Sequence, residues 1–211
     1  MKNKRIVIID YQMSNLYSVK NALEMLGFNV ELTHDKKKLV TADAAILPGV
    51  GAFNEAMSSI NSLDLISPIK DFIDSGKPFM GICLGLQLLL TESEEFGVSK
   101  GLGVIDGVVE HFSKPLPTSI IPHVGWNQIT IPASKKTFTN SNFPVSDNSF
   151  MYFVHSYYVK PSDPDVVCTQ TKYEDLFFCS SILKNNIFAC QFHPEKSGTD
   201  GLEVLKKYFN T

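Results

Sequence analysis

The chain has 211 residues, of which 44% are hydrophobic and 19% charged, and this is enough to bury one substantial core. Nineteen basic against twenty-two acidic side chains leave a net charge of −3, and no basic tract is longer than residues 36–38. This balance argues against a nucleic-acid partner. Neither an apolar run of about eighteen residues nor a signal-peptide pattern is present, which argues against a membrane. We therefore expect a single domain over residues 1–211, located in the cytoplasm.

The four cysteines lie far apart in the sequence and form no C-x-x-C pair: Cys83, Cys168, Cys179 and Cys190. This spacing argues against a zinc site, and a disulfide scaffold is not expected in a chain of this length. We expect no bound metal. At least one thiol is then available for chemistry.

The first ninety residues alternate strand and helix patterns, which is typical of a mostly parallel sheet with helices on both faces. Strands are predicted over residues 5–10, 29–33, 44–47 and 78–82, and the third is expected to stop at Pro48. A helix capped by Ser14 and ended by Gly27 is predicted after the first strand, and further helical patterns close at Gly76.

Beyond residue 100 the hydrophobic period shifts towards two, so the second half is predicted to be β-rich. The apolar runs cover residues 108–112, 126–131, 150–159, 166–171, 177–183 and 187–192. Residues 133–149 form the best candidate for a long surface loop, and residues 201–209 for a closing amphipathic helix. The fold class expected is therefore α/β, with a mixed, mostly parallel central sheet flanked by helices.

Residues 81–85 read Gly-Ile-Cys-Leu-Gly and place Cys83 at the tip of the fourth strand, with a helix expected over 84–90. A strand-to-helix turn of this kind is a nucleophile elbow, in which glycines avoid crowding at both flanks. The helix N-terminus would stabilise a thiolate. The alternative is a buried cysteine in a packed strand.

His193 ends the apolar run 187–192 and is followed at the second position by Glu195. In extended backbone the two side chains project to the same side, so the carboxylate can orient the imidazole and favour its charged form. A surface His-Pro-Glu turn is the alternative. The joint presence of a strand-end cysteine and a strand-end His-x-Glu favours a nucleophile and its base.

Acyl transfer through a thioester also needs an oxyanion hole. The backbone N–H of Leu84, the residue after the nucleophile, is the first expected donor. The glycine-bearing loop 48–51 follows another strand on the same rim of the sheet and can offer a second N–H. Many strand-to-helix turns are rich in glycine for steric reasons alone, which is the competing interpretation.

Five motifs together resemble those of triad (class I) glutamine amidotransferases and, among them, the glutaminase subunits of imidazole glycerol phosphate synthases. They are P-G-V-G-A-F at 48–53, G-I-C-L-G-L-Q-L-L at 81–89, I-P-H-V-G-W-N at 121–127, Y-F-V-H-S-Y at 152–157 and Q-F-H-P-E-K-S at 191–197. The resemblance runs from Arg5 to about Phe209 and implies the three-layer fold of that family.

The resemblance implies that Cys83 attacks the side-chain amide of L-glutamine, that His193 moves the protons and that Glu195 orients His193. It implies oxyanion-hole donors at Leu84 and Val50, the latter after a reorganisation. It implies no cofactor. The positions that match the glutamine-binding residues of the family are Gly51, Gln87, Glu95, His155, Ser156 and Tyr157.

The resemblance also implies a partner, a (β/α)8-barrel synthase subunit that forms a heterodimer with this chain. The barrel would receive ammonia, make imidazole glycerol phosphate and AICAR in histidine biosynthesis, and activate the glutaminase. Positions that resemble the region near that interface are Tyr152, His123, Val124, Trp126 and Asn127. From the residues alone, Trp126 reads as a core anchor.

One departure concerns residues 10–15, where the family usually has D-Y-G-x-G-N and this chain has Gln12 and Ser14 in place of the glycines. Glycine permits positive φ and close approach of a partner. A paralogue that feeds ammonia to another synthase, such as one that modifies a surface sugar, is therefore an alternative. The others are a cysteine hydrolase of peptides or γ-glutamyl compounds and an inactive regulatory subunit.

Overall fold

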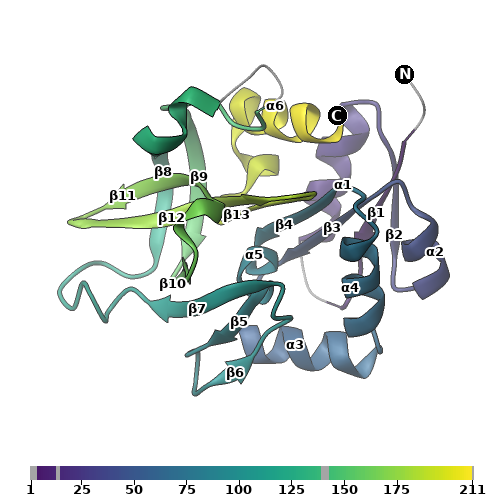
Figure 1. The fold of residues 1–211 in the computed structure, drawn as a ribbon, viewed down its shortest axis with the longest axis horizontal. Coiled ribbons are helices and arrows are strands. Elements are labelled where there is room, and N and C mark those ends of the chain that lie inside the picture. The colour runs from purple at the N-terminus through teal and green to yellow at the C-terminus, as the bar shows by residue number, and fades with distance from the viewer. Residues whose placement is uncertain (1–3, 13–14, 139–142, 211) are drawn as a thin grey trace.

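A computed structural model describes residues 4–12, 15–138 and 143–210 (Figure 1). The first half of the chain builds a parallel sheet whose strand order is β2-β1-β3-β4, with β13 added parallel to β4. Its strands are β1 (Arg5–Ile9), β2 (Asn29–Thr33), β3 (Ala44–Gly49), β4 (Phe79–Cys83) and β13 (Ile187–Cys190). Short apolar runs form these strands because both of their faces are buried.

Residues 90–190 continue the same sheet with mostly antiparallel pairs, in the order β13-β12-β10-β7-β5-β6. Strand β5 pairs parallel to β7, and β11 leads from β12 to the hairpin-like pair β8–β9. The bounds are β5 (Leu90–Ser93), β6 (Ser99–Lys100), β7 (Ile105–His111), β8 (His123–Thr130), β9 (Phe150–His155), β10 (Tyr157–Pro161), β11 (Val167–Tyr173) and β12 (Leu176–Lys184). The predicted mixed sheet with a β-rich second half is confirmed. The expectation that it is mostly parallel holds only for β2-β1-β3-β4-β13, since seven of the twelve pairings among the described strands are antiparallel.

Helices cover both faces of the parallel part of the sheet (Figure 1). In β1, Val7 and Ile9 pack into one core cluster and Ile6 and Ile8 into the other, as the alternation of side chains in a strand requires. One face carries α2 (Lys36–Thr41), α3 (Phe53–Ser62), α4 (Ile66–Asp74) and α5 (Leu84–Leu88), and the other carries α1 (Leu16–Met25) and α6 (Gly198–Phe209). Short 3-10 turns occupy Ala133–Phe138, Pro164–Val166 and Pro194–Lys196.

Three local predictions differ from the structure, and one helix was not predicted. Strand β3 continues through Pro48 to Gly49, because its pairing with β1 ends at Ile46 and leaves only β4 alongside. The helix expected over 84–90 ends at Leu88, since Leu90 pairs with Ile105 in the sheet. The run 150–159 is two strands divided at Ser156, and the run of three lysines at 36–38 begins helix α2, which we did not expect.

Two further predictions concern segments that are only partly described. Residues 133–149, expected as a loop, begin with a 3-10 turn at Ala133–Phe138, and residues 139–142 lie outside the described part. The Ser14 helix cap lies outside the described residues as well. The residue before α1 is Asn15, which is left-handed at φ 77° and makes no side-chain capping bond.

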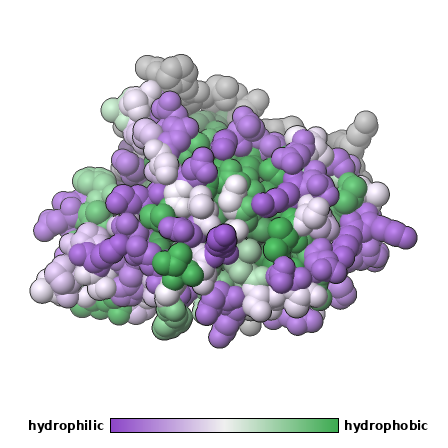
Figure 2. Space-filling view, turned by 60° about the horizontal axis from the view of Figure 1, so that its bottom comes forward, coloured by the Kyte–Doolittle hydropathy of each residue, from purple (hydrophilic) through white to green (hydrophobic). Residues whose placement is uncertain are grey.

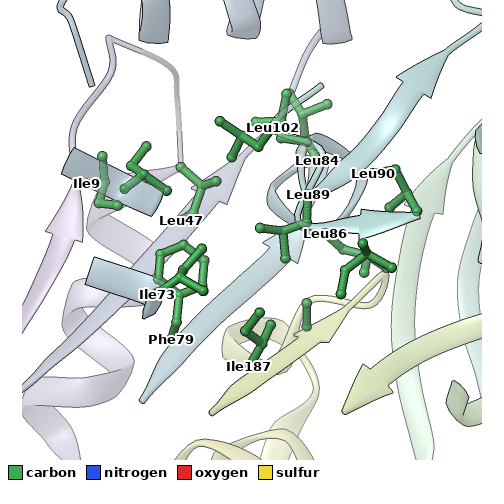
Figure 3. Packing of buried hydrophobic residues seen from close by; sticks show 14 of the residues in the cluster. Ile9, Leu47, Ile73, Phe79, Leu84, Leu86, Leu89, Leu90, Leu102 and Ile187 are labelled. Atoms are coloured by element: carbon green, nitrogen blue, oxygen red, sulfur yellow. The ribbon is translucent and has the colours of Figure 1, made fainter. Parts of the chain in front are cut away.

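The sheet and the helix α5 meet in an apolar cluster that includes Leu47, Leu84, Leu86 and Leu89 (Figure 3). This packing anchors the turn that follows β4.

The lower face of Figure 1 is brought forward in Figure 2, where apolar side chains form patches that polar residues interrupt. In the described part of the chain, no helix has the length and apolar character needed to cross a bilayer.

Candidate active site

Cys83 ends β4 and adopts φ 54° and ψ −110°, a conformation that L-residues rarely adopt. Helix α5 begins at the next residue. A Cβ on Gly85 would lie 1.7 Å from the carbonyl oxygen of Leu47, and one on Gly81 would lie 3.0 Å from the Cβ of Ala189. The tight strand-to-helix turn therefore needs glycine on both sides of the cysteine, as a nucleophile elbow does.

His193 and Glu195 form a buried pair that follows β13, the strand beside β4. The Nδ1 atom of His193 lies 2.8 Å from Oε1 of Glu195, and both side chains have no exposed surface. Burial lowers the pKa of His193, but the adjacent Cys83 sulfur and the Glu195 carboxylate outweigh it and raise the pKa to about 10. The imidazolium form is thereby stabilised next to the sulfur.

The Nε2 atom of His193 has no oxygen or nitrogen hydrogen-bond partner among the described residues, and the Cys83 sulfur is the group beside the ring. Because Nδ1 is held by Glu195, Nε2 is the nitrogen left to exchange a proton. The main chain of His193 is also held: its N–H donates to Tyr152 O at 2.9 Å and its carbonyl accepts from Ser197 Oγ at 2.6 Å. The ring is therefore placed by contacts on both sides of the residue.

Asn15 is a site residue that the sequence reasoning did not single out. Its Nδ2 donates to Oε1 of Glu195 at 2.8 Å, although 180 residues separate the two in the chain. The other oxygen, Oε2, has no partner among the described residues. The D-Y-x-x-x-N pattern at 10–15 was the available signal. Asn15 thus supplies one of the two described hydrogen bonds to a fully buried carboxylate.

A cavity of about 280 Å³ opens beside the sulfur of Cys83. Its lining consists of Val50, Gly51, Cys83, Leu84, Gln87, Glu95, Val154, His155, Ser156 and Tyr157. All of these except Val154 were predicted for the nucleophile, the oxyanion hole or the substrate. The register pairs Gly49 with Cys83, so the residues that follow them, Val50 and Leu84, lie side by side at the carboxyl edge of the sheet.

Tyr11 supports the loop that carries Val50, and the sequence reasoning did not identify it. Its Oη donates to the carbonyl of Pro48 at 2.7 Å. A Cβ on Gly49 would lie 2.0 Å from the same phenol oxygen of Tyr11. Burial, and to a lesser degree the nearby Cys83, raises the pKa of Tyr11 well above its usual range. The phenol therefore stays protonated and remains a donor to this strand end.

One end of the cavity is polar and carries a carboxylate. Oε2 of Glu95 accepts a hydrogen bond from the backbone N–H of Phe53, at the start of α3, at 2.6 Å. Burial, together with the charge of Glu95, raises the pKa of Tyr157, which lines the same cavity. This end of the site thus combines a carboxylate acceptor with a phenol donor.

Two neutral histidines form a hydrogen-bonded pair, in which His155 lines the cavity and His123 lies behind it. Nδ1 of His155 lies 2.8 Å from the carbonyl oxygen of Tyr157, which can only accept, so that nitrogen carries the proton. His155 Nε2 then accepts from Nδ1 of His123 at 3.0 Å, and His123 Nε2 accepts from Asn127 Nδ2 at 3.2 Å. Burial lowers the pKa of His155 to about 3 and that of His123 to about 4.

The residues predicted near a partner do not share one environment. Val124 and Trp126 on β8 are each 56% exposed, whereas the side chain of His123 on the same strand is only 4% exposed. The ring of His123 packs between Phe153 and Tyr173, so His123 presents little of its own surface to a partner. Trp126 is not the core anchor that its residue type suggested, and its ring meets Tyr152 at the surface.

No group of three or more His, Cys, Asp or Glu side chains suited to a metal ion occurs within residues 4–12, 15–138 and 143–210. All four cysteines are free and buried. Burial raises the pKa of Cys168 to about 12 and also raises those of Cys179 and Cys190. These three thiols belong to the core, whereas Cys83 lines the cavity.

The family of class I glutamine amidotransferases matches residues 7–210 of the chain. The chain belongs to this family. A subunit HisH of imidazole glycerol phosphate synthase from Rhodopirellula baltica is 44% identical over 203 residues, covering 96% of both chains. The subunit HisH from Gloeothece citriformis is 45% identical over 209 residues, covering 97% of this chain and 95% of the other. This amidotransferase therefore groups with the HisH subunits.

Solved structures share the fold of this amidotransferase at lower sequence identity. The structure of PurLQS from Thermotoga maritima aligns with a TM-score of 0.75 at 20% identity, over 99% of this chain and 98% of the other. A crystal structure of a glutamine amidotransferase aligns with a TM-score of 0.74 at 16% identity, over 97% of both chains. The three-layer α/β fold expected from the motifs is thereby confirmed.

Proposed function

We propose that Cys83, His193 and Glu195 hydrolyse L-glutamine to L-glutamate and ammonia through a cysteinyl thioester. The chain is a glutaminase subunit of imidazole glycerol phosphate synthase, an enzyme of histidine biosynthesis. The observation that carries the residue roles is the sulfur at the strained end of β4, next to the buried His193–Glu195 pair and open to one cavity. We propose that residues 1–211 form one catalytic domain.

In the first half of the reaction, the sulfur of Cys83 attacks the side-chain amide carbon of glutamine and forms a C–S bond. The carbonyl oxygen takes up the displaced electron pair, and the N–H groups of Val50 and Leu84 stabilise that charge. His193 donates its Nε2 proton to the amide nitrogen, the C–N bond breaks, and ammonia leaves. The raised pKa of His193, about 10, keeps this proton in place near neutral pH.

In the second half, water attacks the thioester while Nε2 of His193 takes its proton. The C–S bond breaks, glutamate leaves, and the sulfur regains its starting state. Glu195 stays bonded to Nδ1 throughout, which holds the ring in one orientation. Glu95 and Tyr157 lie at the polar end of the cavity, where a carboxylate suits the ammonium group of the substrate and a phenol its carboxylate.

The partner that receives the ammonia is, in our proposal, a (β/α)8-barrel synthase subunit that binds as a heterodimer. The exposed apolar side chains of β8 and β9 support a docking surface there: Val124, Trp126, Phe150 and Val154. Val154 also lines the substrate cavity, so this surface adjoins the site where ammonia forms. Gln12, which stands where the family motif has glycine, takes φ 69°, in the left-handed region that glycine favours, and Ser14 lies outside the described residues.

We place this reaction in the cytoplasm, where reduced thiols persist, and all four cysteines of the chain are free.

The substitution Cys83→Ala tests the proposal in the complex with a barrel synthase subunit, by measuring glutamate and ammonia released from glutamine. We expect loss of turnover with the complex intact. The control is Cys168→Ala, a buried core thiol on β11, which should retain turnover. Wild-type turnover in Cys83→Ala would refute the nucleophile.

A further inference from the structure

Gln191 lies directly after β13, two residues before His193, and its side chain is fully buried. Its Nε2 is 3.6 Å from the sulfur of Cys83, within the range of a hydrogen bond to sulfur. Its backbone N–H donates to the carbonyl of Ser180 at 2.9 Å, which fixes the main chain against β12. The residue therefore reaches the sulfur from the end of β13 and does not line the substrate cavity.

The orientation of the Gln191 amide follows from its neighbours. The carbonyl of Tyr157 can only accept, so Nε2 of Gln87 must face it, at 3.2 Å. The same Nε2 of Gln87 also faces Oε1 of Gln191, at 3.0 Å. With its oxygen taken by Gln87, the Gln191 side chain presents its NH2 group to the sulfur. A flipped amide would oppose two NH2 groups and aim a carbonyl oxygen at the sulfur.

A buried thiolate needs hydrogen-bond donors, because water cannot solvate it there. Cys83 is only 6% exposed, and its charged partner His193 is fully buried. A donor whose own oxygen is held by a second amide loses little freedom when it bonds the sulfur. Hydrogen bonds to charged groups are roughly twice as strong as those between neutral groups.

We propose that Gln191 is a thiolate-stabilising residue of this enzyme: its Nε2–H donates to the Cys83 sulfur, and Gln87 and the Tyr157 carbonyl hold it in that orientation. The inference rests on the proposed glutaminase function, because it assigns Gln191 a part in activating the same nucleophile. Gln191 acts before substrate binds, and it holds the sulfur in the position from which the sulfur attacks.

The test is the pH dependence of Cys83 alkylation by iodoacetamide in the full chain, followed by mass spectrometry. In Gln191→Leu we expect the alkylation midpoint to rise by about one pH unit and the rate at pH 7 to fall about tenfold, since a hydrogen bond to a charged group is lost. Gln191→Glu, which aims an oxygen at the sulfur, should shift the midpoint further. Gln170→Leu removes a half-buried amide that lines a different cavity, and this control should leave the alkylation midpoint unchanged.

Glutamine turnover in the complex with the barrel subunit separates the two proposals. Gln191→Leu should lower kcat about tenfold or more, because the residue bonds the sulfur. KM should change less than about threefold, because Gln191 does not line the cavity itself and reaches it only through its bond to Gln87. Turnover that survives in Cys83→Ala defeats the proposed function itself. Loss of turnover in Cys83→Ala, with an unshifted alkylation midpoint in Gln191→Leu, defeats only the role of Gln191.

A measurement on the unsubstituted chain covers the case in which the variants do not fold. The side-chain amide resonances of Gln191, observed by NMR, should titrate with the midpoint found by alkylation of Cys83, and this titration should vanish in Cys83→Ala. Amide resonances that stay constant across that midpoint in the wild-type chain would overturn the proposal.

Discussion

Asn15 offers the sharpest test of how the buried carboxylate is held. Oε1 of Glu195 accepts from His193 and from Asn15, each at 2.8 Å, and no described residue bonds Oε2. Because Asn15 has φ 77°, the substitution Asn15→Gly removes the amide without forcing the backbone to change. The variant therefore isolates one hydrogen bond to a charged group that has no exposed surface.

The expected loss follows from that bond alone. A hydrogen bond to a buried charged acceptor contributes about 1.5–3 kcal/mol. If the bond from Asn15 helps to orient His193 in the transition state, losing it lowers kcat roughly tenfold to hundredfold. We expect kcat to fall within that range while KM for glutamine stays nearly constant, since Asn15 does not line the cavity. Asn15→Asp should be worse, because it places a second carboxylate against Glu195.

The assay is glutamate formation by the complex with the synthase subunit, with urea unfolding of the isolated chain beside it. Asn21→Gly is the matched control, since Asn21 is an exposed residue of α1. The Asn21→Gly variant should lower the free energy of unfolding by up to about 1 kcal/mol, because glycine has a low helix propensity, and it should leave kcat unchanged. If Asn15→Gly turned over glutamine at the wild-type rate, the carboxylate would not depend on Asn15 and the reasoning would be wrong.

Three other predictions follow from the same geometry. Gly85→Ala places a Cβ 1.7 Å from the Leu47 carbonyl oxygen, so the urea midpoint should fall by an amount equivalent to roughly 1–3 kcal/mol or more; an unchanged midpoint would contradict the tight turn. Val50→Pro deletes the expected oxyanion donor and should lower kcat by about 10² to 10³, whereas an unchanged rate would exclude Val50. The folded-state pKa of His155, about 3, lies below its unfolded value of 6.5, so its contribution to stability is complete above pH 6.5 and is lost as pH falls towards 3. At pH 5 this loss is about 2 kcal/mol, and thermal melts should show a shallower acid dependence in His155→Gln than in the wild-type chain.

The strands of the parallel sheet could be predicted because both faces of each are buried. The apolar run at 29–33 became β2 with the expected ends, and the run at 78–82 became β4 with Cys83 as its last residue. The five-residue helix α5 could not be predicted in length. Every residue from Leu84 to Leu90 is buried, so the sequence has no amphipathic period that marks where the helix ends. Pairing of Leu90 with β7 decides it.

Helix α2 shows the opposite case, a local signal that was present and overlooked. Asp35 caps the helix by accepting from the N–H groups of Lys37 and Lys38, and this capping pattern can be recognised in the sequence. The helix begins with three lysines, and Leu39 is its only buried residue, so its sequence does not look like that of an amphipathic helix. A helix with one core side chain has almost no hydrophobic period to detect.

The amino-acid sequence by itself determined the chemistry of this protein: glycines that permit a strained turn around Cys83, and a His-x-Glu spacing that pairs imidazole with carboxylate. The His-x-Glu pair depends on residues two positions apart, where backbone geometry is nearly independent of the rest of the fold. The crowding that requires Gly81 and Gly85 comes instead from Ala189 and Leu47 on neighbouring strands. Only the tertiary structure decided what supports that chemistry. Asn15 bonds Glu195, which is 180 residues away in the chain, and Gln191 bonds the sulfur of Cys83, which is 108 residues away. Sheet order and register bring these segments together, and no local sequence pattern encodes them.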